Sequence, residues 1–146
     1  MTRPRRLPGH LTRVLCGMAL YLGLLHTTCA QHSPQQLAQD AQRHLAIAQA
    51  HSAAAQCLTD GGQPPNCLSV LKASCVGLGI GKYCGLKEDA VAQAADALRQ
   101  TAHAHQRMAQ CIGSQKPYED CLWDLQSACK GLAVGKYCGM VHSHTF

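Results

Sequence analysis

The sequence predicts an all-α protein of two homologous helical hairpins, four helices in total, held together by disulfide bonds or by a bound metal ion. One reason is an internal repeat, because a shift of 54 residues aligns the second half of the chain with the first. Another is that two long stretches rich in Ala, Gln, Leu and His have no interior Gly or Pro, which favours helix. The third is a set of ten cysteines, eight of which recur at the same spacing in both copies.

Residues 1–30 are expected to be a signal peptide. A basic head is followed by an apolar run over residues 14–25 and by small residues before Gln31, a pattern that predicts cleavage there. The apolar run is shorter than the roughly 20 residues needed to cross a membrane. Lipidation of Cys29 and twin-arginine export through the basic head are the alternatives. The favoured interpretation is a periplasmic or secreted protein with no stable membrane insertion after cleavage.

Cleavage before Gln31 leaves 116 residues, which is the size of one domain. Residues 31–86 would form the first hairpin, and residues 87–146 the second hairpin with a short tail. Four of the thirteen basic residues leave with the leader, so nine remain against eight acidic residues and the net charge is about +1. With one Trp and one Phe, the chain has neither a basic stripe nor an aromatic platform, which argues against a nucleic-acid partner.

Each copy of the repeat has the cysteine pattern C-x9-C-x7-C-x8-C. The cysteines are Cys57, Cys67, Cys75 and Cys84 in the first copy, and Cys111, Cys121, Cys129 and Cys138 in the second. A repeat of this length is one supersecondary unit that packs against its copy, because it cannot bury its apolar face alone. The pairs Lys82-Tyr83 and Lys136-Tyr137 are identical. Packing of the tyrosine on its loop explains them, and a paired recognition surface is the alternative.

The long helices, expected over residues 34–58 and 88–112, share a stripe of small residues. Four positions at steps of seven, three and four are identical in the two copies and lie on one helix face. They are Ala41, Ala48, His51 and Ala55 in the first copy, and Ala95, Ala102, His105 and Ala109 in the second. Alanine buries little area, so this core is expected to be thin for its length and to need cross-links.

The short helices are expected to start near Asn66 and Asp120, after turns rich in Gly and Pro, and these two side chains could cap them. Apolar residues at steps of three and four place Cys75 and Cys129 on the core-facing side. Glycines that follow these cysteines are expected to end the helices, namely Gly77, Gly79 and Gly81 in the first copy and Gly131 and Gly135 in the second.

An even number of cysteines at repeated spacing in an exported protein indicates a disulfide framework. Cys67 and Cys75 are eight residues apart on one helix, a rise of about 12 Å, whereas disulfides join Cα atoms roughly 4.4–6.8 Å apart. Cys57 ends one helix and Cys67 begins the next, so they can face each other across the turn. The predicted pairs are Cys57 with Cys67, Cys75 with Cys84, Cys111 with Cys121, and Cys129 with Cys138.

The competing interpretation keeps some cysteines reduced as ligands of a soft metal, Cu(I) or zinc. In an antiparallel hairpin, Cys75 lies within about one turn of His51, and Cys129 has the same relation to His105. The predicted metal ligands are therefore His51, Cys75, His105 and Cys129. The alternative for both histidines is a core position with a hydrogen bond to a neighbour.

Further soft donors occur near the second copy, although a frayed terminus accounts for those in the tail. They are Met108, Met140, His142 and His144. No Cys-x2-Cys knuckle or His-Glu-x-x-His motif is present, so the usual zinc patterns are absent. The acidic pairs lie at expected helix starts, where they complement the helix dipole. No catalytic constellation remains, and we do not expect an enzyme.

The segment HAHQRMAQCIGSQKPYEDC, from His103 to Cys121, resembles small exported Cys- and His-rich helical proteins of proteobacteria that are associated with copper or heavy-metal stress. The shared features are a His, a Met-Ala-x-Cys and a Ser-x-Lys-Pro turn before the next cysteine. The first copy departs from this pattern, since Ala54 replaces the Met and its turn differs. The resemblance implies a metal-related role centred on the second hairpin.

These observations predict an extracytoplasmic helical protein that binds or buffers a soft metal such as copper. The alternative is a disulfide-stabilised helical module that binds another protein or component of the cell envelope and holds no metal. A third possibility combines them, with disulfides as scaffold and only His and Met available to the metal. The state of the thiols separates the first two, because four disulfides leave no thiolate.

Overall fold

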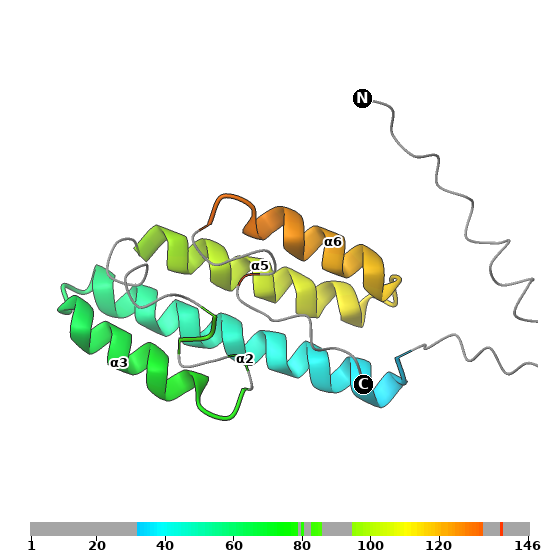
Figure 1. The fold of residues 1–146 in the computed structure, drawn as a ribbon, viewed down its shortest axis with the longest axis horizontal. Helices are drawn as coiled ribbons and strands as arrows, with labels where there is room; N and C mark the ends of the chain where they lie inside the picture. Colours follow the sequence, from blue (N-terminus) through cyan, green and yellow to red (C-terminus); the bar gives the residue numbers. More distant parts are fainter. Residues whose placement is uncertain (1–31, 79, 81–82, 86–94, 133–137, 139–146) are drawn as a thin grey trace, which may run out of the picture. The chain divides into compact units, whose positions relative to one another are not determined.

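The computed structural model describes residues 32–78, 80, 83–85, 95–132 and 138, and within them it is all-helical with no strand. The four helices are α2 (Pro34–Thr59), α3 (Pro64–Cys75), α5 (Ala95–Gly113) and α6 (Tyr118–Cys129), and they belong to one compact unit (Figure 1). The predicted all-α fold class is confirmed. The expected signal peptide, helix residues 88–94, the Lys82, Lys136 and Tyr137 positions and the tail donors lie outside the described residues.

The two long helices α2 and α5 lie side by side and antiparallel, and each carries one short helix. Helix α3 folds back on α2 and α6 folds back on α5, so each sequence repeat forms one hairpin (Figure 1). The most extensive packing between elements is that of α2 on α5. The two hairpins therefore meet through their long helices.

Both short helices start two residues before Asn66 and Asp120, and their N-cap residues are Gln63 and Pro117. The amides of Asn66 and Asp120 donate to the carbonyl oxygens of Gln63 (2.9 Å) and Pro117 (3.0 Å), so both residues already lie in the first turn. Neither helix has a side-chain hydrogen bond at its cap. Pro64 begins α3 because its fixed φ suits a first helical position, where an amide hydrogen is not needed.

The short helices end as predicted, at a glycine that follows each core cysteine. Gly77 (φ +82°) and Gly131 (φ +88°) have left-handed backbones, which glycine adopts without a Cβ clash. The next amides, of Leu78 and Leu132, donate back to Cys75 and Cys129 at 3.2 and 3.1 Å. The chain thus turns sharply after each short helix.

The eight cysteines form four disulfides in the predicted pairing, with Cα atoms 5.1–5.6 Å apart. Cys57–Cys67 and Cys111–Cys121 join the long helix of each hairpin to its short helix. Cys75–Cys84 and Cys129–Cys138 tie the segment after each short helix back to its end, and we call these two the loop disulfides. Cys84 and Cys138 both have φ +48°. The last cysteine of each hairpin therefore has the same backbone conformation and the same kind of disulfide.

The core is built largely from alanines and disulfide sulfurs, as the small-residue stripe predicts. Ala48, Ala55, Ala102 and Ala109 are buried, whereas Ala41 and Ala95 are half-buried. Tyr83 packs partly buried against the core of the first hairpin. Among the largest side chains that are fully buried are three histidines, His44, His51 and His105. The middle of the molecule is therefore polar.

Among the described residues, no helix is long and apolar enough to cross a membrane.

Candidate functional site

The candidate site is a cluster of three histidines between α2 and α5. His44 and His51 lie on α2, His105 lies on α5, and all three side chains have no exposed surface. A step of seven places His44 and His51 on the same face of α2, two turns apart. The ring of His105 is near both, with its centroid 5.1 Å from that of His44 and 6.2 Å from that of His51. We call these residues the histidine cluster.

His44 and His105 share a hydrogen bond between their Nδ1 atoms, at 2.8 Å. His105 Nε2 lies 3.4 Å from the carbonyl oxygen of Cys138. Because a carbonyl only accepts, His105 must carry a hydrogen on Nε2 to make this contact, which leaves its Nδ1 as an acceptor. In the hydrogen bond between the two Nδ1 atoms, His44 is therefore the donor and His105 the acceptor.

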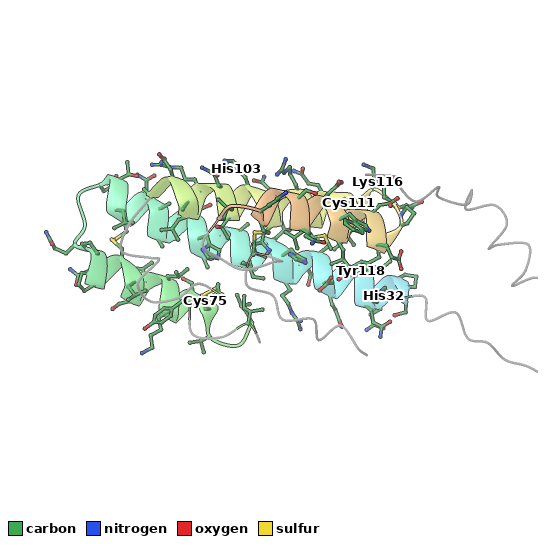
Figure 2. All side chains as sticks on the ribbon, turned by 45° about the horizontal axis from the view of Figure 1, so that its top comes forward. His32, Cys75, His103, Cys111, Lys116 and Tyr118 are labelled. Carbon is green, nitrogen blue, oxygen red and sulfur yellow. A yellow bond between two sulfur atoms is a disulfide. The ribbon has the colours of Figure 1, made fainter. Side chains whose placement is uncertain are left out.

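A carboxylate and a phenol lie on the other side of His44 and extend this series of contacts. Asp40 Oδ2 lies 3.8 Å from His44 Nε2, one turn away on α2. The Tyr118 hydroxyl, at the start of α6, donates to the same Asp40 oxygen at 2.6 Å (Figure 2 shows Tyr118). Burial raises the pKa of Tyr118 far above its usual value, and the bond to Asp40 adds to this. The chain Tyr118–Asp40–His44–His105 thus connects α6, α2 and α5.

His51 has a different environment, since neither of its ring nitrogens makes a hydrogen bond within the described part of the chain. Its ring lies nearly parallel to that of His105, with 5° between the planes. The Cys84 backbone acts on the ring and raises its pKa, but it lies outside hydrogen-bonding geometry. Buried polar groups are almost always hydrogen-bonded, so such a group needs an explanation, for which a bound ion or water is a common one.

The imidazoles of His51 and His105 are held in the neutral form at neutral pH. Burial, and then the proximity of His105, lower the pKa of His51 from 6.5 to about 4. Burial, and then the proximity of His44, lower the pKa of His105 to about 3. The backbone of Cys84 partly offsets this by raising the pKa of His51, and the backbone of Cys138 does the same for His105. Neutral imidazole is the form that binds metal ions.

The repeat places His51 and His105 at equivalent positions, but His44, Asp40 and Tyr118 have no such counterparts. A shift of 54 residues carries His44 onto Leu98, Asp40 onto Ala94 and Pro64 onto Tyr118. Leu98 is buried in the core of the first hairpin. The His51–His105 pair and the backbones of Cys84 and Cys138 are therefore the symmetric part of the site. Asp40 and His44 occur only in the first copy.

The structure brings together two of the four predicted metal ligands. His51 and His105 meet in the cluster, whereas Cys75 and Cys129 are bonded to Cys84 and Cys138 and offer no thiolate in this oxidation state. Within the described part of the chain, no three His, Cys, Asp or Glu side chains converge closely enough to hold one ion as they stand. Met108 is buried in the core of the second hairpin.

Sequence analysis missed His44, Asp40 and Tyr118. A usable signal was present, because Asp40, His44 and His51 follow one another at steps of four and seven on one helix face. This pattern does not recur in the second copy, where Ala94 and Leu98 stand at the positions equivalent to Asp40 and His44. Tyr118 carried no such signal, since its contact with Asp40 joins residues 78 positions apart.

The outer surface of α5 and α6 has two shallow hollows. One, of about 610 Å³, is lined by Gln100, His103, Gln106, Arg107, Gln110 and Ala128. The other, of about 560 Å³, lies beside Trp123, whose side chain is 60% exposed. Figure 2 shows His103 on α5, where its side chain is exposed.

Comparison with protein-family models, with curated proteins and with solved structures finds no match to this chain. The site is therefore interpreted from its own geometry.

Proposed function

We propose that the protein is an extracytoplasmic, disulfide-stabilised helical module that binds a soft metal ion through imidazole nitrogens alone. The observation that carries the proposal is the histidine cluster, above all the fully buried His51 with no hydrogen bond to either nitrogen. Leaving such a group unpaired is costly, so a ligand that the nitrogen can bind would stabilise the fold.

The chemistry of the donors favours copper, with zinc as the second choice. Imidazole is a suitable ligand for both metals. The four disulfides leave none of their eight cysteines as a thiolate ligand. Disulfides of this number are typical of oxidising compartments, where a copper-buffering protein would have to work without free thiols. The disulfides are then the scaffold and the histidines the ligands.

The spacing of the rings supports an ion between His51 and His105. Their centroids are 6.2 Å apart. Two metal–nitrogen bonds of about 2.0–2.1 Å each, plus the distance from each nitrogen to its ring centre, add to nearly this length. One nitrogen of each ring must turn toward the other ring. For His105 the nitrogen that turns is Nδ1, which exchanges its contact with His44 for the ion while Nε2 keeps its contact with Cys138, and for His51 the turn breaks no hydrogen bond.

A titration of the full chain with its disulfides intact tests the proposal. Cu(I), buffered by a competing chelator, is expected to bind at one ion per chain, and zinc more weakly. His51→Leu and His105→Leu are expected to abolish binding while circular dichroism stays helical. His103→Leu is the control, because this histidine is exposed on α5. Absence of binding by the folded protein, or equal loss in the His103 variant, would overturn the proposal.

A second candidate is a binding module for an envelope protein, favoured by the exposed Trp123 beside its hollow. Exposed Trp is unusual and is enriched at interfaces. A photo-cross-linker placed at Gln126, which lines the same hollow, is expected to trap one partner, and Trp123→Ala should abolish the adduct. An adduct that persists in this variant would count against a partner at this surface.

A further inference from the structure

We propose that His44 is a third ligand of the same metal centre and that Asp40 and Tyr118 hold its ring in position. This inference rests on the metal binding proposed above and specifies which residues form the site. It adds to His51 and His105 a residue that their repeat symmetry does not supply, because Leu98 stands at the equivalent position of the second copy.

The first argument is the arrangement of the three rings. A histidine that binds a metal through one nitrogen usually donates its other N–H to a carboxylate or a backbone carbonyl, which fixes the ring. His44 Nε2 faces the Asp40 carboxylate at 3.8 Å, and His105 Nε2 faces the Cys138 carbonyl at 3.4 Å. The rings of His44 and His105 therefore each face a group of the kind that metal-binding histidines use as an outer partner.

The second argument is the direction of the inner nitrogens. With their Nε2 atoms turned outward, His44 and His105 point their Nδ1 atoms at each other, at 2.8 Å. An ion bound by both needs these nitrogens up to about 4 Å apart, since each metal–nitrogen bond is about 2.0–2.1 Å. An opening of about 1 Å is thus enough for two ligands. His51 can become the third ligand only if its ring turns, and no hydrogen bond to a described residue holds this ring.

The third argument is the position of Tyr118. Its hydroxyl donates to Asp40 Oδ2, the same oxygen that faces His44 Nε2. Tyr118 belongs to the second hairpin and Asp40 to the first, so this hydrogen bond fixes the carboxylate from across the interface between hairpins. Removing the hydroxyl removes this hydrogen bond, and we expect the carboxylate to hold the His44 ring less firmly. Asp40 and Tyr118 are therefore positioning residues, and they do not touch the metal.

Tyr118→Phe tests the positioning role because it keeps the ring and removes one oxygen. Loss of an outer-shell partner typically costs 10–100-fold in metal affinity, and we expect a loss of about 10-fold or more for Cu(I). Asp40→Asn keeps an oxygen that can accept from Tyr118 and is expected to retain more affinity than Asp40→Ala. Equal affinity of the wild-type and Tyr118→Phe proteins, both folded, would overturn the positioning role.

X-ray absorption of the copper-loaded full chain tests the third ligand directly. We expect three nitrogen neighbours in the wild type and two in His44→Leu, with a weaker Cu(I) affinity in the variant. Leu98→Ala is the matched control, because it changes a buried side chain at the repeat-equivalent position and removes no nitrogen. Two nitrogens in both wild type and His44→Leu would overturn the inference but not the proposed function. Failure of the folded wild type to bind copper would overturn both.

Discussion

His51 and His105 occupy equivalent positions of the two repeats, and their rings lie nearly parallel across the α2–α5 interface, with centroids 6.2 Å apart. Both side chains are fully buried. The two hairpins thus meet around imidazoles at a place where most helical proteins have aliphatic side chains. The stability of the interface must depend on keeping these rings uncharged, or on giving them a ligand.

Acid is expected to destabilise the metal-free protein. The folded-state pKa values of His51 and His105, about 4 and about 3, lie below the ordinary value of 6.5, so the unfolded chain binds more protons between these limits. Their contribution is fully present above pH 6.5 and is lost as the pH falls toward 4. The free energy of unfolding should fall by about 1.4 kcal/mol per pH unit for each histidine in this window.

Urea unfolding at several pH values from 7.5 to 4.5 measures this slope. His105→Leu should make the slope shallower, whereas His103→Leu should leave it unchanged, because that side chain is exposed. A stability that is constant from pH 7.5 to 4.5 would show that the buried histidines accept protons freely, contrary to the burial seen here.

The pair of Asp40 and His44 is expected to be strongly coupled. His44→Leu alone leaves a buried carboxylate without its imidazole partner, and removing one member of a buried pair costs about 3 kcal/mol or more. The double variant Asp40→Ala, His44→Leu reproduces the residues Ala94 and Leu98 of the other repeat. It should recover most of the loss in urea unfolding. Additive effects of the two single substitutions would contradict the coupling.

Most of the fold could be predicted from the sequence because its determinants are local. Helix composition, the 54-residue repeat and the short separations between paired cysteines each act within one hairpin, and they gave the four helices and all four disulfides. The short helices start two residues before the predicted Asn66 and Asp120, because Pro64 begins α3 and Pro117 precedes the first residue of α6.

The site could be predicted only in part, because it depends on how two hairpins align. His51 and His105 were found through the repeat, which carries information about symmetric contacts. The contact of His44 with His105 joins non-equivalent positions 61 residues apart and depends on the register of α2 against α5. Nothing in the local sequence sets that register.

The loop disulfides are expected to affect metal binding more than the disulfides between helices. Cys129–Cys138 holds the carbonyl that faces His105 Nε2, whereas Cys111–Cys121 closes the turn of the hairpin. Their sequence separations are 9 and 10, so removing either should cost a similar stability, about 2.5–3 kcal/mol. Cu(I) affinity should fall only in Cys129→Ala, Cys138→Ala. Equal affinities in the two double variants would argue against a role for the Cys138 carbonyl.

Gly62 is expected to be required at the first turn. A Cβ there would lie 2.6 Å from the Cys57 carbonyl oxygen and 2.7 and 2.8 Å from the sulfurs of Cys57 and Cys67. Gly62→Ala should therefore lower the free energy of unfolding by about 1–3 kcal/mol through overpacking. Lys116→Ala, at the exposed equivalent position of the second copy, should change it by about 0.5 kcal/mol or less. Thermal unfolding of both variants checks this, and equal losses would contradict it.

The central claim is that imidazoles bind the metal while all eight described cysteines remain in disulfides. Native mass spectrometry of the protein after exposure to Cu(I), followed by denaturation with an alkylating agent and no reductant, tests this claim most directly. We expect one copper ion per chain. Peptide mapping should show no alkylated cysteine from Cys57 to Cys138. Bound copper together with alkylated cysteines in that range would contradict it and make thiolates the ligands.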